Sequence, residues 1–178
     1  MNVTIPTWLE PAISFLKAHM LLSPIAIAVA AFIESFAFIG ILTPGTVILP
    51  ALGFVAGTLA IPMPIVFFCC YIGAFVGDTS SYFLGRYCKE PILAISLVKK
   101  YQHFILDAEK YFQKWGILSL ALGRFIGPLR PILPFLAGSF KVSLKLFLLL
   151  NALTAIGWTI LYCMLGFYAG AATLGVAH

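Results

Sequence analysis

Charged residues are scarce in this 178-residue chain. They make up 10% of it, while hydrophobic residues make up 62%, whereas a typical soluble domain is about a quarter charged. Two long stretches, Ser35 to Gly77 and Leu146 to His178, hold no Asp, Glu, Lys or Arg. A membrane-spanning helix needs about 20 mainly apolar residues. The composition therefore argues against a soluble domain and predicts one all-helical integral membrane domain over residues 1–178.

Histidine and cysteine are also few, and their positions exclude several kinds of chemistry. None of the four cysteines has the spacing to a histidine that a metal site requires. A lipid phosphatase would need a histidine nucleophile and a second histidine as acid-base, yet after His103 only the terminal His178 remains. We therefore expect no enzyme activity, no metal, no cofactor and no nucleic-acid partner.

The first twenty residues, MNVTIPTWLEPAISFLKAHM, lack the pattern of a signal peptide. They have no basic start followed by an apolar core and a small-residue cleavage site. The pattern favours a short amphipathic helix that lies at the membrane interface.

Two halves of the chain resemble each other. Pro50–Tyr87 aligns without gaps to Pro131–Tyr168, and nine of the 38 aligned pairs are identical. An apolar composition raises such a count, so the paired prolines and the pairing of Ala56-Gly57 with Ala137-Gly138 carry the argument. We interpret the pattern as an internal repeat.

Each half is predicted to form a helical hairpin followed by one long helix. Repeat 1 covers about residues 21–87 and repeat 2 about residues 111–170. The predicted helices are Leu21–Leu42, Pro62–Arg86, Tyr111–Ile126 and Lys145–Tyr168, and the hairpin turns are Pro44, Gly45, Gly127, Pro128 and Pro131.

These breaks cannot face lipid, because unpaired backbone groups are too costly in hydrocarbon. Each hairpin is therefore expected to be re-entrant. A hairpin plus one span crosses the membrane an odd number of times, so two such units in succession have opposite orientation. An inverted repeat with broken helices is typical of transporters.

Basic residues predict the orientation. They gather between the repeats, whereas the segment after the first hairpin, Thr58–Val66, has no charge. Cytoplasmic loops carry an excess of Lys and Arg, so we expect a multi-pass protein of the inner (plasma) membrane with its central loop in the cytoplasm. The basic residues of that loop are Arg86, Lys89, Lys99, Lys100, Lys110 and Lys114.

The central loop also contains an amphipathic segment, about residues 99–115. Its apolar residues recur at helical spacing, and lysines occupy much of the other face. The apolar face either lies on the membrane surface as an interfacial helix or packs on the rest of the protein. The sequence leaves both interpretations open.

Four ionisable residues lie in otherwise apolar surroundings: Glu34, Asp78, Arg124 and Arg130. Each costs roughly 2.5–3.5 kcal/mol at the bilayer centre, and such residues are functional by default. The alternative is that two acids and two bases pair and hold the hairpins together. The two interpretations are compatible, because a ligand can displace a resting ion pair.

The two arginines and the two acids suggest different roles. Forked guanidinium donors beside a helix that starts at Pro131 suit a phosphate, and the apolar flanks suit an acyl or prenyl tail. Arg124 and Arg130 are therefore candidate ligands of an anionic lipid headgroup. Glu34 and Asp78 are candidates for proton coupling. About 15 Å of helix is expected between Glu34 and the break at Pro44.

The segment GRFIGPLRPILPFLAG, which begins at Gly123, resembles the signature of the DedA family. FIESFAFIGILTPGTVILPALGFVAGTLA is similar to the family's first hairpin, and GAFVGDTSSYFLGR and NALTAIGWTILYCMLGFYAG resemble its two following spans. The resemblance implies an inner-membrane lipid carrier that is linked to undecaprenyl phosphate recycling, the proton motive force and envelope integrity. It also implies that Glu34, Arg124 and Arg130 are essential. Related eukaryotic domains are scramblases.

The leading hypothesis is a transporter that moves an anionic prenyl phosphate or phospholipid between leaflets, with protons as a candidate driving force. An uncoupled scramblase with the same groove is the alternative. A structural assembly factor is a further alternative, although it would not require buried charges at the hairpin tips.

Overall fold

The computed structural model describes residue 14 and residues 22–42, 45–93, 102–124 and 130–173, which form helices and no strand. The elements after residue 22 are α2 (Ser23–Ser35), α3 (Ile39–Leu42), α4 (Gly45–Thr58), α5 (Met63–Leu93), α7 (Gln102–Trp115), α8 (Leu118–Gly123), α9 (Ile132–Ser139), α10 (Leu144–Thr159), the π-helical turn η4 (Ile160–Met164) and α11 (Leu165–Thr173).

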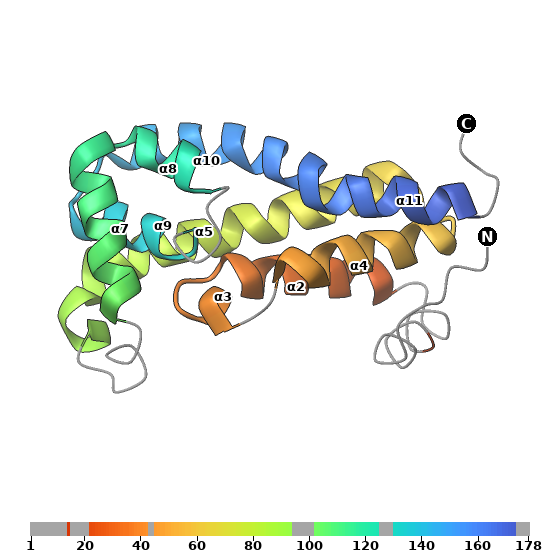
Figure 1. Ribbon diagram of the computed structural model, residues 1–178, viewed down its shortest axis with the longest axis horizontal. Coiled ribbons are helices and arrows are strands. Elements are labelled where there is room, and N and C mark those ends of the chain that lie inside the picture. The colour runs from red at the N-terminus through yellow and green to blue at the C-terminus, as the bar shows by residue number, and fades with distance from the viewer. Residues whose placement is uncertain (1–13, 15–21, 43–44, 94–101, 125–129, 174–178) are drawn as a thin grey trace.

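Two long helical rods run the length of the molecule, α5 and the continuous series α10–η4–α11 (Figure 1). Their apolar parts, Met63–Cys88 and Leu144–Ala172, are 26 and 29 residues long. At 1.5 Å per residue the shorter part extends about 39 Å, which exceeds the roughly 30 Å hydrocarbon core of a bilayer. The two long helices predicted from the sequence are thus confirmed as helices, with ends that differ by a few residues.

The first hairpin bends earlier than predicted. A single helix over Leu21–Leu42 is wrong, because α2 ends at Ser35 and Phe38 has a positive φ of 67°. The backbone N–H of Ala37 donates to the Ser81 hydroxyl at 2.7 Å, so a tertiary contact satisfies a group that the bend leaves free. Glu34 consequently lies at the bend instead of about 15 Å from it.

The second hairpin also differs from its prediction. A single helix over Tyr111–Ile126 is wrong, because the chain turns at Gly116, where φ is 55°. Glycine adopts this left-handed conformation without steric cost. The turn separates α7 from α8, and α9 starts directly after Pro131.

The turns that follow α4 and α9 have the same geometry. Ala60 and Lys141, which are equivalent in the sequence alignment, have positive φ values of 52° and 55°. The N–H of the following residue bonds the carbonyl of the alanine in the Ala-Gly pair, at 3.1 Å after Ala60 and 3.0 Å after Lys141. This is the Schellman pattern of a helix end. The aligned segments therefore share local backbone structure.

The second helix of each hairpin packs on the long helix of the other half, whereas α2 packs on α5 of its own half. Helix α4 lies along α11, and α9 lies along α5. Two equivalent glycines permit this closeness: a Cβ on Gly166 would collide with the backbone of Pro50, and a Cβ on Gly85 with that of Phe135. The hairpin helices approach from opposite ends of the molecule, α2 and α4 from one and α8 and α9 from the other (Figure 1). Their inner ends meet midway along the long helices.

Helix α7 packs its apolar face on α9. Ile105, Ala108 and Phe112 are buried in one cluster with Leu133 and Phe135. The sequence left open whether this apolar face lies on the membrane surface or packs on the rest of the protein. For these three residues the structure shows packing on the protein.

Candidate functional site

The four intramembrane charges predicted from the sequence meet in the interior. Glu34 lies in the last turn of α2, Asp78 lies on α5, Arg124 follows α8 and Arg130 lies just before α9, and each is at most 7% exposed. Arg130 pairs with Glu34 and Arg124 with Asp78, each at 2.6 Å. Both arginines come from the second half of the chain and both acids from the first, so the pairs tie the two halves together.

Three residues from two helices surround the Arg130 guanidinium. Its Nη1 donates to Glu34 Oε1, and its Nη2 donates to the Ser35 hydroxyl at 2.7 Å. The guanidinium carbon lies 3.7 Å from the centre of the Trp158 ring, which is within range of a cation–π contact. Its Nε has no hydrogen-bond partner among the described residues.

Arg124 is held through one nitrogen. Its Nη1 contacts Asp78, donates to Asn151 Oδ1 at 2.8 Å, and lies 3.5 Å from the Thr154 hydroxyl. The amide of Asn151 is itself fixed, since it donates to the Phe75 carbonyl at 3.2 Å. Within the described part of the chain, Nε and Nη2 of Arg124 are buried without a hydrogen-bond partner. The edge of the guanidinium that carries two parallel N–H groups is thus unused.

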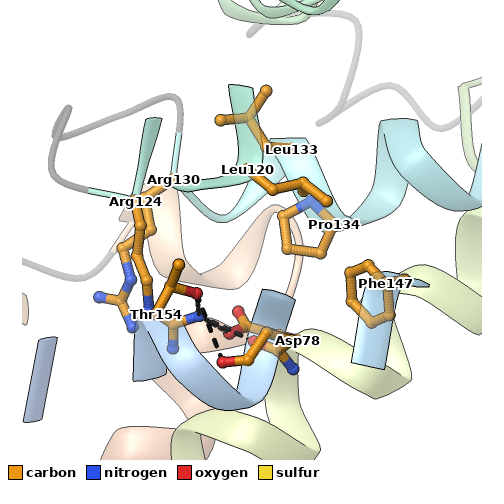
Figure 2. Close-up of a pocket in the computed structure, with 9 residues that line it drawn as sticks. Asp78, Leu120, Arg124, Arg130, Leu133, Pro134, Phe147 and Thr154 are labelled. Carbon is orange, nitrogen blue, oxygen red and sulfur yellow. Dashed lines mark hydrogen bonds and ion pairs between the residues drawn. The ribbon is translucent and has the colours of Figure 1, made fainter. Parts of the chain in front are cut away.

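A small pocket, with about 10 Å³ of free space, opens beside these groups. Figure 2 shows Arg124 and Arg130 reaching into it from one side, with apolar side chains on the other. The described residues that line it are Asp78, Leu120, Arg124, Arg130, Leu133, Pro134, Phe147, Asn151 and Thr154.

The pocket has the chemistry of a small oxyanion site. A buried donor without a partner costs about 1–3 kcal/mol, and an oxyanion would satisfy several such donors at once, as bidentate arginine contacts do. The free space is about that of one water molecule, so a phosphate could enter only if the surrounding side chains move apart. No cluster of His, Cys, Asp or Glu that could hold a metal occurs in the described ranges.

The structure also places the predicted turn residues. Gly45 is the first residue of α4, and Pro131 immediately precedes α9. Pro44, Gly127 and Pro128 lie outside the described residues.

Sequence reasoning missed several residues of the site. Ser35, Asn151, Thr154 and Trp158 are not among the site residues predicted from the sequence. A signal was available, because Asn151, Thr154 and Trp158 follow one another at spacings of three and four. Such spacing puts all three on one face of a helix.

Comparisons with known proteins place the chain among membrane proteins. Residues 43–168 match the VTT domain model. The chain is 32% identical over 92% of its length to an "Uncharacterized membrane protein" of Buchnera aphidicola subsp. Schizaphis graminum, covering 64% of that protein. It is 30% identical over 89% of its length to "Inner membrane protein YabI" of Escherichia coli, covering 62% of it. "Protein DedA" of Escherichia coli matches 56% of the chain at 30% identity, over 46% of its own length. No solved structure matches.

Proposed function

The chain belongs to the DedA family of VTT-domain membrane proteins, and on that premise we propose that it moves an anionic lipid phosphate between membrane leaflets. The lipid is undecaprenyl phosphate or a phospholipid, and the role is envelope maintenance. The chain spans about two thirds or less of the relatives it matches, so the proposal concerns the site that this chain contains.

One observation carries the proposal. Two buried arginines face a pocket with N–H groups that find no partner among the described residues, and the opposite wall is apolar. Water-soluble anions need no apolar wall, whereas a prenyl or acyl phosphate presents a charge directly joined to hydrocarbon. The arginines would bind the phosphate, and the apolar wall would receive the first carbons of the chain.

The crosswise packing supports a transport geometry. In the proposed topology the hairpins are re-entrant, enter from opposite membrane faces and meet at mid-depth, with the basic central segment in the cytoplasm. A site at the interface of inverted repeats can be exposed to each side in turn when one repeat moves against the other. Here the two ion pairs bridge that interface.

Glu34 is the proposed site of proton coupling. Arg130 faces it directly, and Asp78 and Arg124 are the next charged groups within reach. Its Oε2 is buried without a hydrogen-bond partner in the described residues. When Glu34 is protonated it loses its ionic attraction to Arg130, which frees that arginine for a phosphate.

A scramblase without proton coupling is the second candidate, because the same pocket would serve it. The deciding experiment reconstitutes the pure protein in liposomes and follows a labelled prenyl phosphate from one leaflet to the other, with and without a pH gradient. Movement that a gradient accelerates supports the transporter, and movement that is independent of the gradient supports the scramblase. No movement of prenyl phosphate or phospholipid would overturn both.

A further inference from the structure

The two acids are not equivalent with respect to the pocket. Asp78 lines it together with both arginines, whereas Glu34 does not, although Glu34 binds Arg130. Glu34 is thus linked to the pocket through Arg130. An anion that enters would meet Asp78 and not Glu34.

Asp78 would share Arg124 with an anion that enters the pocket. Its carboxylate lies 2.6 Å from Arg124 Nη1 and is 1% exposed. A phosphate on the free Nε and Nη2 edge of Arg124 would share one buried guanidinium with this carboxylate, from the opposite side. Two negative charges on one cation repel each other in a site that holds little water. Both cannot hold Arg124 at full strength.

We propose that Asp78 is a built-in competitor of the substrate: its carboxylate occupies Arg124 in the empty site, and the phosphate must dislodge or neutralise it to bind. This inference rests on the proposed function and adds a role for a residue that does not touch the lipid in the bound state. The competitor keeps Arg124 paired when no lipid is present, because an unpaired buried charge is strongly destabilising. Asp78 also weakens binding of the phosphate, so the headgroup can dissociate into the opposite leaflet.

If Asp78 competes with the substrate, removal of its negative charge should strengthen phosphate binding. Asp78→Asn removes the negative charge but keeps the shape, so it should tighten binding of a phosphate even though it lowers the stability of the empty protein. Glu34→Gln frees Arg130 and should also tighten binding, but less than Asp78→Asn does, because Glu34 does not line the pocket. Asp107→Asn is the matched control for net charge, since Asp107 is exposed on α7 and pairs only with Lys110 in the described structure.

The test measures binding of farnesyl phosphate, inorganic phosphate and farnesol to the detergent-solubilised full chain by calorimetry. We expect farnesyl phosphate to bind Asp78→Asn at least about tenfold more tightly than wild type, Glu34→Gln less than about threefold more tightly, and Asp107→Asn like wild type. Equal affinity in Asp78→Asn and wild type overturns the inference and leaves the proposed function standing. An equal or larger gain in Glu34→Gln also overturns it.

Further measurements distinguish a lipid phosphate from free phosphate. One of them uses only the wild-type protein, so it does not depend on the folding of a variant. Binding of inorganic phosphate as tight as that of farnesyl phosphate, with the same gain in Asp78→Asn, overturns the lipid function but supports the competitor. Failure of every variant to prefer farnesyl phosphate to farnesol overturns both. In wild type, farnesyl phosphate should increase labelling of Asp78 by a hydrophobic carbodiimide, read by mass spectrometry, and leave Glu34 unchanged. No increase at Asp78 contradicts the inference without any substitution.

Discussion

The guanidinium carbon of Arg130 lies 3.7 Å from the centre of the Trp158 ring, and both side chains are buried. Arg124 lies farther from the same ring, at 5.7 Å. Trp158 thus provides a face against which Arg130 is held while its Nη1 and Nη2 bind Glu34 and Ser35. We infer that the ring fixes the position of the Arg130 guanidinium beside the pocket.

Trp158→Leu should therefore weaken farnesyl phosphate binding, whereas Trp158→Phe should keep most of it. A cation–π contact contributes about 0.5–2 kcal/mol, so the loss in Trp158→Leu should be about two- to thirtyfold. The measurement is calorimetric binding in a double-mutant cycle with Arg130→Lys, which separates the pairwise effect from general damage. Equal losses from Trp158→Leu with either residue at position 130 would show that the ring acts only in packing.

Lysine at position 124 or 130 should support transport poorly, and alanine should abolish it. A lysine ammonium is a compact charge that does not reproduce the planar fork of a guanidinium. The measurement is leaflet-to-leaflet movement of labelled prenyl phosphate in liposomes with equal amounts of folded protein. Arg86→Lys, on an exposed arginine of α5 outside the pocket, is the control. Wild-type rates in both lysine variants would contradict the proposed phosphate contact.

Gly166→Ala should destabilise the protein by about 1–3 kcal/mol, the usual cost of overpacking. The new Cβ would meet the carbonyl of Pro50, a backbone atom that can move only if α4 shifts away from α11. Thermal unfolding in detergent measures the change. Leu165→Ala is the matched control, because Leu165 is 68% exposed. An unchanged unfolding temperature in Gly166→Ala would mean that α4 and α11 are not in close contact.

Features that depend on local composition could be predicted from the sequence. The long helices were visible as long, mostly charge-free stretches, and the paired prolines and Ala-Gly pairs indicated the internal repeat. The four charges of the site stood out because an ionisable residue in an apolar stretch is expensive. None of these features requires knowledge of contacts between distant parts of the chain.

Features that depend on distant contacts could not be predicted. The bend after Ser35 is stabilised by Ser81, which is 44 residues from Ala37. Arg130 pairs with Glu34 across 96 residues of sequence, and nothing local indicates which acid each arginine selects. The pocket is formed by such long-range contacts, so its lining residues could not be derived before the fold was known.

Orientation can be tested with single cysteines in a background that lacks Cys69, Cys70, Cys88 and Cys163. A cysteine at exposed Gln113 on α7 should react with a membrane-impermeant maleimide only from the cytoplasmic side, because basic loops stay inside. A cysteine at exposed Met63 should react only from outside. Labelling of both positions from the same side would rule out the inverted arrangement of the two repeats.

Glu34→Gln tests whether the acid at the bend couples protons to transport. Glutamine keeps the size and the hydrogen bond to Arg130 but is neutral at every pH, so the ion pair with Arg130 is permanently lost. Arg130 would then be available to the phosphate without proton uptake. We expect the variant to bind farnesyl phosphate and to move lipid, but without the acceleration that a pH gradient gives to wild type.

The measurement for Glu34→Gln compares transport rates in liposomes with and without an imposed gradient. Asp107→Asn serves again as the control for charge, since its carboxylate is exposed and does not line the pocket. An undiminished response to the gradient in Glu34→Gln would remove Glu34 as the coupling acid and direct attention to Asp78, the other buried carboxyl beside the arginines. A wild-type protein that ignores the gradient would favour the scramblase, because an uncoupled carrier needs the arginines but no titrating acid.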